Sequence, residues 1–116
     1  MMNKTINVNR QLLEEVIQRI IEVAHPDKVI LFGSGARGEL GPHSDLDILV
    51  ITQEPIHRGR LTEAIYLNLM GVGQAVDVIV VTPEDVENYR DNPYLVIGPA
   101  LKEGKVVYEH ETAIAE

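Results

Sequence analysis

The sequence contains no cysteine. Disulfide bonds, a thiol nucleophile and a zinc site built on cysteine are therefore excluded. The chain also lacks an apolar run long enough to cross a membrane, and its first residues, MMNKTINVNRQ, lack the apolar segment of a secretory signal peptide. We expect a cytoplasmic protein that does not engage a membrane.

Positive charge is scarce as well. The chain carries 10 lysine and arginine residues against 18 aspartate and glutamate residues, for a formal net charge of -8. An acidic domain of this size repels a phosphate backbone. We therefore expect no direct binding to long DNA or RNA.

Hydrophobic residues, by contrast, are abundant enough for a packed core. They make up 45% of the 116 residues. This length and composition predict one domain over residues 1–116, with a core from about residue 9 to residue 109 and short frayed ends. Internal repeats, low-complexity segments and linkers are absent from the sequence.

The spacing of apolar residues and of helix-breaking residues predicts alternating helices and strands. Along the chain these are a helix over about residues 9–24, the strands KVILFG and DLDILVIT, the helix GRLTEAIYLNLM, the strand QAVDVIVV, a helix opened by Thr82-Pro83, a helical segment YLVIGPALKEG interrupted at Gly98-Pro99, and a short edge strand KVVYE. This order favours an α/β fold of the α+β kind, with a small mixed sheet packed against helices.

The stretch VILFGSGARG follows a strand and spells G-x-G-x-x-G with Gly33, Gly35 and Gly38. The same spelling marks the dinucleotide site of a Rossmann fold. That fold needs a helical crossover of a dozen or more residues between its first two parallel strands. Here the connection is SGARGELGPHS, whose glycines and proline limit any helix to about two turns. The Rossmann interpretation is therefore disfavoured.

An antiparallel pairing of the first two strands suits such a short connection better. The end of the first strand, at Gly33, then faces the start of the second, at Asp45 and Asp47. These two aspartates are two positions apart and point to the same side of a strand. A helix separates the second strand from the third, so a right-handed parallel crossover can bring Asp77 beside them. The sequence thus predicts three carboxylates in one site.

Such a cluster of like charges calls for a cation. Mg²⁺ accepts carboxylate oxygens together with substrate phosphates, and two such ions can stabilise an in-line displacement. Gly33 allows the backbone to approach a phosphate, and the amides of a short helix starting near Ser34 would point at it. These features favour phosphoryl transfer from a nucleoside triphosphate.

Each of these signals also has a plainer interpretation when it is taken alone. The glycines from Gly33 to Gly38 could form only a tight turn, and Asp45 and Asp47 could be solvated residues at the start of a strand. Asp77 could be an outward-facing polar residue of an alternating strand. The order in which the features occur together is what favours a site.

A family resemblance rests on the same residues. GSGARGELGPHSDLDILV resembles the G-S-x-A-R-G…S-D-x-D signature of the polymerase-beta-like nucleotidyltransferases, and VDVIVV resembles the strand that bears their third carboxylate. From about residue 9 to residue 109 the chain is similar to the minimal nucleotidyltransferases, the antitoxin half of HEPN/MNT toxin–antitoxin pairs. Gly35 occupies the variable position of the signature. A glycine at that position produces the spelling G-x-G-x-x-G, which explains why the segment matches the Rossmann motif.

The resemblance implies roles for the matching residues. Asp45 and Asp47 match the metal-binding pair, and Asp77 matches the third acid, which helps to activate the acceptor hydroxyl. We expect all three to act in catalysis and to bind the metal together. Gly33 and Ser34 match the phosphate-binding turn. The implied fold is that of polymerase-beta-like nucleotidyltransferases, and the implied cofactor is Mg²⁺, as two ions, with ATP as the substrate.

Two further nucleotide-binding residues follow from the signature. Arg37 matches its arginine, whose role is either a phosphate contact or a structural hydrogen bond. Ser44 precedes the acid pair and caps or orients that turn. None of the expected acids is missing from the sequence.

The resemblance also implies a function. We expect a Mg²⁺-dependent transfer of AMP from ATP to a tyrosine of a HEPN partner, an RNase toxin that the transfer silences, because the chain has no second domain to hold an acceptor. Two alternatives remain open. One is a small-molecule adenylyltransferase of the aminoglycoside-modifying kind, and the other is a noncatalytic antitoxin that inhibits by binding.

Overall fold

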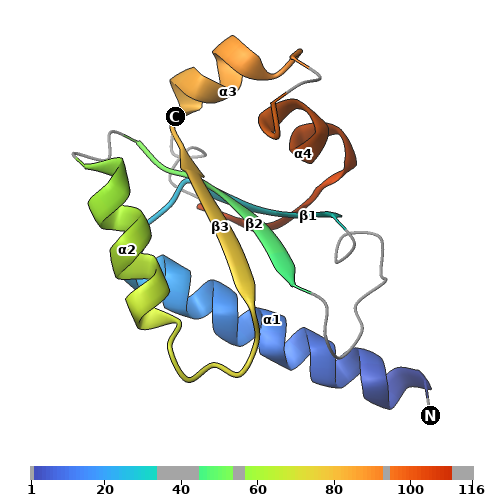
Figure 1. The fold of residues 1–116 in the computed structure, drawn as a ribbon. Coiled ribbons are helices and arrows are strands. Elements are labelled where there is room, and N and C mark those ends of the chain that lie inside the picture. The colour runs from blue at the N-terminus through green and yellow to red at the C-terminus, as the bar shows by residue number, and fades with distance from the viewer. Residues whose placement is uncertain (1, 34–44, 54–56, 93–94, 111–116) are drawn as a thin grey trace.

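The computed structural model describes residues 2–33, 45–53, 57–92 and 95–110, with side chains from Arg10 onward. None of the helices in these ranges is both long enough and apolar enough to cross a membrane. In chain order (Figure 1) the elements are α1 (Met2–Ala24), β1 (Lys28–Phe32), β2 (Leu46–Ile51), α2 (Arg58–Asn68), β3 (Val76–Val81), α3 (Pro83–Tyr89), α4 (Ile97–Glu103) and β4 (Lys105–Glu109).

The four strands form one mixed sheet in the order β3-β2-β1-β4. β1 pairs with β2 and with β4 in antiparallel fashion, whereas β2 and β3 are parallel. The antiparallel start of the sheet, the parallel crossover through α2 and the edge position of β4 confirm the predictions from the sequence. Because the first two strands are antiparallel, the Rossmann topology is excluded.

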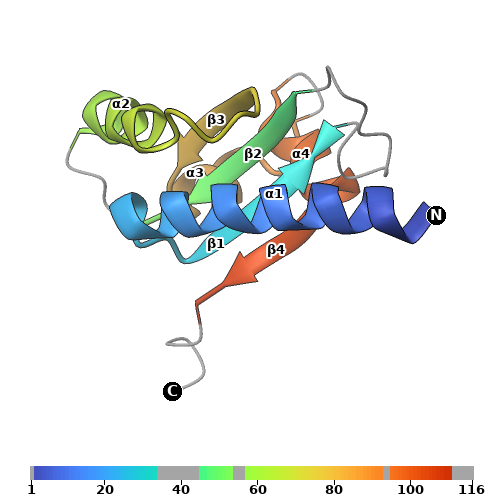
Figure 2. The ribbon, with the colours of Figure 1, turned by 90° about the horizontal axis from the view of Figure 1, so that it is seen from below.

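Two long helices cover one face of the sheet. Figure 2 shows α1 crossing in front of the strands, with α2 beside it and α3 and α4 behind the sheet. The alternation of side chains along β1, β2 and β3 turns every second residue toward α1 and α2. The buried residues of this layer are Val16, Ile20, Ala24, Val29, Leu31, Leu46, Ile48, Val50, Ile65, Leu69, Val78 and Val80.

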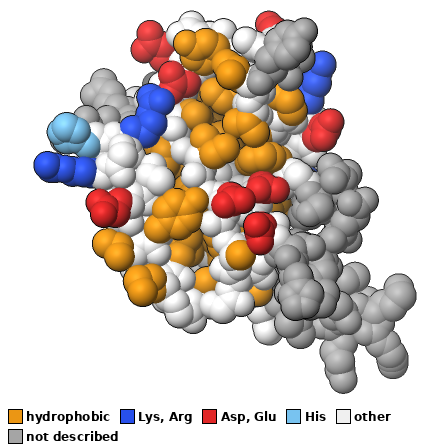
Figure 3. Space-filling model, in the orientation of Figure 1, with side chains coloured by type: hydrophobic (Ala, Val, Ile, Leu, Met, Phe, Trp, Pro, Cys, Tyr) orange, Lys and Arg blue, Asp and Glu red, His pale blue; other side chains and the backbone are white. Residues whose placement is uncertain are grey.

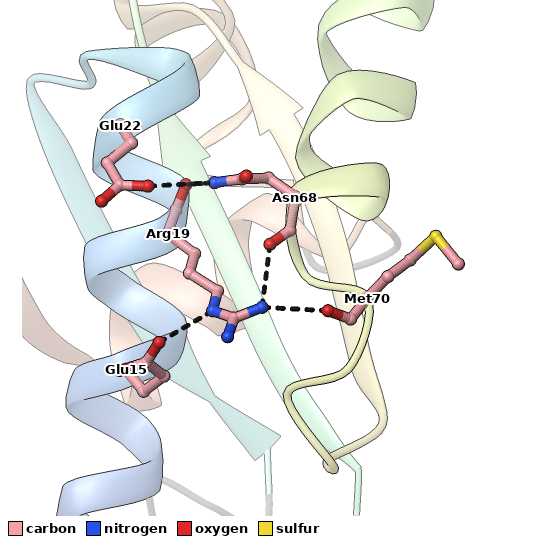
Figure 4. Close-up of polar contacts among 5 residues, drawn as sticks. All are labelled: Glu15, Arg19, Glu22, Asn68 and Met70. Atoms are coloured by element: carbon pink, nitrogen blue, oxygen red, sulfur yellow. Dashed lines mark hydrogen bonds and ion pairs between the residues drawn. The ribbon is translucent and has the colours of Figure 1, made fainter.

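A single arginine joins the two long helices (Figure 4). The Arg19 guanidinium of α1 donates hydrogen bonds to the backbone carbonyls of Asn68, at 3.2 Å, and Met70, at 3.0 Å. The Asn68 side chain returns a bond to the carbonyl of Arg19 at 2.8 Å. Since the last carbonyls of a helix lack partners within it, this cation from another helix satisfies the C-terminal end of α2.

Two short helices cover part of the opposite face. α3 and α4 have seven residues each. The Thr82 hydroxyl accepts from the Asp85 amide, and the Asp85 carboxylate accepts from the Thr82 amide, both at 3.1 Å, so a capping box starts α3 as predicted. The buried residues of this layer are Ile30, Leu49, Ile51, Val81, Ile97 and Ala100.

The start of α1 and the course of α4 differ from the predictions. α1 begins at Met2 rather than near residue 9. The predicted interruption at Gly98-Pro99 is wrong, because both residues lie in the first turn of α4, where a proline removes no intrahelical hydrogen bond. Gly98 is required there by close packing, since a Cβ at this position would lie 2.7 Å from the carbonyl oxygen of Asn92.

Candidate active site

The predicted carboxylates lie at one end of the sheet face that carries α3 and α4. Asp47 is the second residue of β2, and Asp77 is the second residue of β3. The two are direct partners across the parallel ladder. Because Leu49 and Ile79 follow two positions later and pack beneath the short helices, Asp47 and Asp77 point to that same face. Asp45 immediately precedes β2 and is exposed.

The charges of these three residues affect one another. The pKa of Asp47 is raised above the ordinary aspartate value, first by partial burial and then by the negative charges of Asp77 and Asp45. Both effects disfavour the ionised carboxylate. The negative charges of Asp45 and Asp77 therefore reach the Asp47 carboxylate, and the structure brings the three predicted acids into one neighbourhood.

Gly33 lies directly against Asp47. It follows β1 with a φ of 72°, a conformation that favours glycine. A Cβ at this position would collide with Oδ2 of Asp47 and lie 3.3 Å from its Cγ. The structure thus gives Gly33 a role that the sequence did not suggest: the missing side chain makes room for the Asp47 carboxylate. The predicted approach of this backbone to a phosphate stays a prediction.

Figure 3 shows acidic side chains gathered near the middle of this face, beside hydrophobic side chains that continue toward α3 and α4. Phe32 and Ile79, both only partly buried, belong to this apolar surface. Phe32 is also the partner of Asp47 across the antiparallel ladder. The carboxylates therefore stand at the border between partly buried hydrophobic side chains and solvent.

Known proteins share this arrangement of strands and helices. The family described as "Polymerase beta, Nucleotidyltransferase" matches residues 14–113. The chain belongs to this family.

Two solved structures have a similar fold. A candidate nucleotidyltransferase from Sulfolobus solfataricus superposes with a TM-score of 0.60 at 20% identity, over 88% of this chain and 81% of that one. A toxin–antitoxin solved with AMP-PNP superposes with a TM-score of 0.54 at 20% identity, over 86% of this chain and 76% of that one. No curated protein matches the chain significantly. At this level of identity the likeness establishes only that this chain shares its fold with the two structures.

The carboxylates of Asp45 and Asp47 are ligands of the type that Mg²⁺ prefers, but they do not surround an ion by themselves. In the part of the chain that the structure describes, no three acidic or histidine side chains are gathered as a ready-made set of metal ligands. Mg²⁺ is usually held by one or two carboxylates, several waters and substrate phosphates. Asp45 and Asp47 supply hard oxygen ligands of this kind, and the unbalanced charge around Asp47 is what a cation would neutralise. The residues present therefore fit a site that a nucleotide would complete.

The other predicted nucleotide-binding residues, Ser34, Arg37 and Ser44, lie outside the described residues. Their roles stay predictions from the family signature.

A hollow of about 300 Å³ lies between the end of α3 and α4, away from the predicted residues. Arg90 and Lys102 line it together with Asp91 and Glu103, so its charges balance. It contains none of the three aspartates, and its mixed lining does not select an anion such as a triphosphate.

One residue near the site was missed by the sequence reasoning. The amide of Val78 donates a 2.8 Å hydrogen bond to the hydroxyl of Tyr66, which belongs to α2. Among the described residues β3 is an edge strand, so no strand in this part of the chain lies on its outer side to receive the amide. Tyr66 thereby holds β3 one residue away from Asp77. No local pattern in the sequence indicates this contact, because 12 residues separate its partners.

Proposed function

We propose that the protein is a Mg²⁺-dependent adenylyltransferase that moves AMP from ATP to a tyrosine of a HEPN toxin and so acts as its antitoxin. The observation that carries this proposal is the pairing of Asp47 with Asp77 across two parallel strands, with Asp45 close enough to raise the pKa of Asp47. The family membership supports nucleotidyl transfer as the reaction type.

The division of work among the three acids is the one that the family signature implies. Asp45 and Asp47 would hold Mg²⁺, and the bound ion would supply neutralisation of the triphosphate charge. Asp77 lies at the outer strand and is more exposed than Asp47, so an acceptor from another molecule can reach it. Its carboxylate accepts the proton of the incoming tyrosine hydroxyl.

The reaction is an in-line displacement at the α-phosphorus of ATP. The tyrosine oxygen forms a bond to this phosphorus, the bond from the phosphorus to the oxygen of the leaving pyrophosphate breaks, and the hydroxyl proton passes to Asp77. The products are an adenylylated tyrosine and pyrophosphate. Gly33 contributes by leaving the space in which the Asp47 carboxylate is held.

A toxin partner is supported by two observations. One similar fold belongs to a toxin–antitoxin that was solved with AMP-PNP, an ATP analogue. The chain carries 18 acidic and 10 basic side chains, a balance suited to a basic RNA-binding partner. A phosphate added to such a toxin would repel RNA from its active site.

The test is intact-mass spectrometry of a candidate HEPN partner, after incubation with the chain and ATP in Mg²⁺ or in EDTA. We expect the partner to gain the mass of one or more AMP groups only in Mg²⁺. Asp47→Asn and Asp77→Asn should slow the transfer by about 100- to 1000-fold, the scale on which single charge-stabilising groups act. Asp91→Asn, an exposed aspartate after α3, serves as the matched control and should leave the rate unchanged.

Two results would redirect the assignment. Loss of toxin RNase activity without any change of its mass would indicate a noncatalytic antitoxin. Pyrophosphate release with an aminoglycoside as acceptor, and none with the partner, would indicate a small-molecule adenylyltransferase.

A further inference from the structure

An apolar surface runs along α2 next to the outer edge of β3. Tyr66, Leu67 and Met70 are 40%, 62% and 70% exposed. Ile65 and Leu69 of the same segment are buried against the sheet, so the three exposed residues form the outer side of the helix end. We call these residues, with β3 beside them, the α2–β3 edge. Large apolar side chains that gather on one exposed side of a helix end are candidates for contact with another molecule.

The α2–β3 edge is held in place by hydrogen bonds from two directions. Arg19 binds the carbonyl of Met70 at 3.0 Å, which fixes the end of the helix against α1 (Figure 4). Tyr66 accepts the Val78 amide at 2.8 Å, which fixes the helix against β3. Surfaces that are ordered before binding lose less entropy when a partner arrives. The same Tyr66 contact makes the α2–β3 edge continuous with Asp77, one residue away from Val78.

Negative charge predominates around the α2–β3 edge, where the neighbouring Arg19 and Arg58 are each paired with a carboxylate, at 2.8 Å and 2.9 Å. From residue 61 to residue 89 the sequence contains no lysine, arginine or histidine, and its acidic residues are Glu63, Asp77, Glu84, Asp85 and Glu87. One of them, Asp85, is paired with Arg58 at 2.9 Å. In a symmetric contact between two copies of this chain the same acidic surface would face itself, which is repulsive. The charge therefore favours a basic partner over a second copy.

We infer that the α2–β3 edge is the surface on which the acceptor protein docks. The partner is a basic protein whose apolar side chains cover Tyr66, Leu67 and Met70 and whose basic residues face the acidic segment. This inference rests on the proposed function, because a docked partner would present its hydroxyl along β3 to Asp77. Beyond the proposed function, the inference identifies the surface that selects the acceptor protein.

The experiment compares two edges of the sheet. Leu67→Arg and Met70→Arg each place a positive charge on the α2–β3 edge, where a basic partner would repel it. Val106→Arg places the same charge on β4, the opposite edge strand, at a residue that is 52% exposed. All three positions are exposed, so the variants should fold. The affinity for the same candidate HEPN partner is measured by titration calorimetry. The ATP affinity of each variant alone and its mass in solution are measured as well.

We expect Leu67→Arg and Met70→Arg to weaken the affinity for the partner by about 100-fold, as for a central interface residue, and Val106→Arg to change it by less than about threefold. ATP affinity should be unchanged in all three variants. Equal partner affinity in Leu67→Arg and wild type would overturn the inference. So would a wild-type dimer that Leu67→Arg converts to a monomer, because the surface would then belong to self-association.

The two proposals fail in different ways. If the wild type binds the partner through this surface but never modifies it, the docking inference stands and the proposed chemistry falls. If the wild type modifies the partner and Leu67→Arg does so with unchanged affinity, the chemistry stands and the docking inference falls. If the wild type does not bind the partner at all, both are overturned.

Discussion

The two faces of the sheet are covered to different extents. On the face of α1 and α2, the side chains of Val16, Ile20, Ile48 and Ile65 are fully inaccessible to solvent. On the other face, two helices of seven residues cover only part of the strands, and Ile79 remains partly exposed. The carboxylates stand on this second face. The like charges of the site therefore lie on the face that is less completely covered, although Leu49 is fully buried there too.

The largest expected effect is the difference in stability between two variants in which an isoleucine is replaced by alanine, one on each face of the sheet. Ile48→Ala, in β2 beneath α1 and α2, should lower the free energy of unfolding by about 3–4 kcal/mol, because a well-packed site cannot collapse around the cavity. Ile79→Ala, in β3 on the other face, should cost about half as much. Urea denaturation of both variants measures the difference, and equal losses would show that the second face is as tightly packed as the first.

The next comparison concerns two glycines with a left-handed backbone, whose substitution should have similar effects on stability but different effects on ATP binding. Gly33 has a φ of 72° and Gly71 a φ of 85°, but only the space beside Gly33 is filled, by Asp47. Both Gly33→Ala and Gly71→Ala should cost about 1–2 kcal/mol of stability from backbone strain. Only Gly33→Ala should also displace the Asp47 carboxylate and abolish Mg²⁺-dependent ATP binding. Calorimetric titration decides this, and intact ATP binding in a folded Gly33→Ala protein would contradict the arrangement.

The smallest effect concerns the stability that the fold loses to the ionised Asp47 carboxylate. Because folding raises the pKa of Asp47, the folded chain binds this proton more tightly than the unfolded chain, and ionised Asp47 destabilises the fold. In the absence of Mg²⁺ at pH 7, Asp47→Asn should therefore stabilise the protein, by about 0.5 kcal/mol, the scale of a partly exposed charge pair.

This gain should shrink as the pH falls through the raised pKa of Asp47 and vanish below the ordinary aspartate pKa of about 4, where the wild type is protonated in both states. Thermal melts at pH 7 and pH 3.5 measure it, with Asp91→Asn as the control. A gain that persists at pH 3.5 would assign the stabilisation to a cause other than charge.

Much of this molecule was predictable because its signals are local. The alternation of apolar residues predicted β1, β2 and β3, and the short connection before Asp45 predicted an antiparallel start, since a parallel one needs a longer crossover. From these two facts the meeting of Asp47 with Asp77 followed. The error at Gly98-Pro99 arose because a proline ends a helix only when it lies in the interior, and where α4 begins is decided by packing against residues 90–92.

The sequence by itself thus determined the arrangement of β1, β2 and β3 around the acids and the meeting of Asp47 with Asp77, because spacing along a strand dictates which side chains share a face. Only the tertiary structure decided that Gly33 makes room for Asp47, that Arg19 satisfies the end of a helix 49 residues away, and that Tyr66 joins α2 to β3 beside Asp77. Each of these is a contact across space between separate elements. Periodicity describes only neighbours along one element, so no repeat in the sequence encodes them.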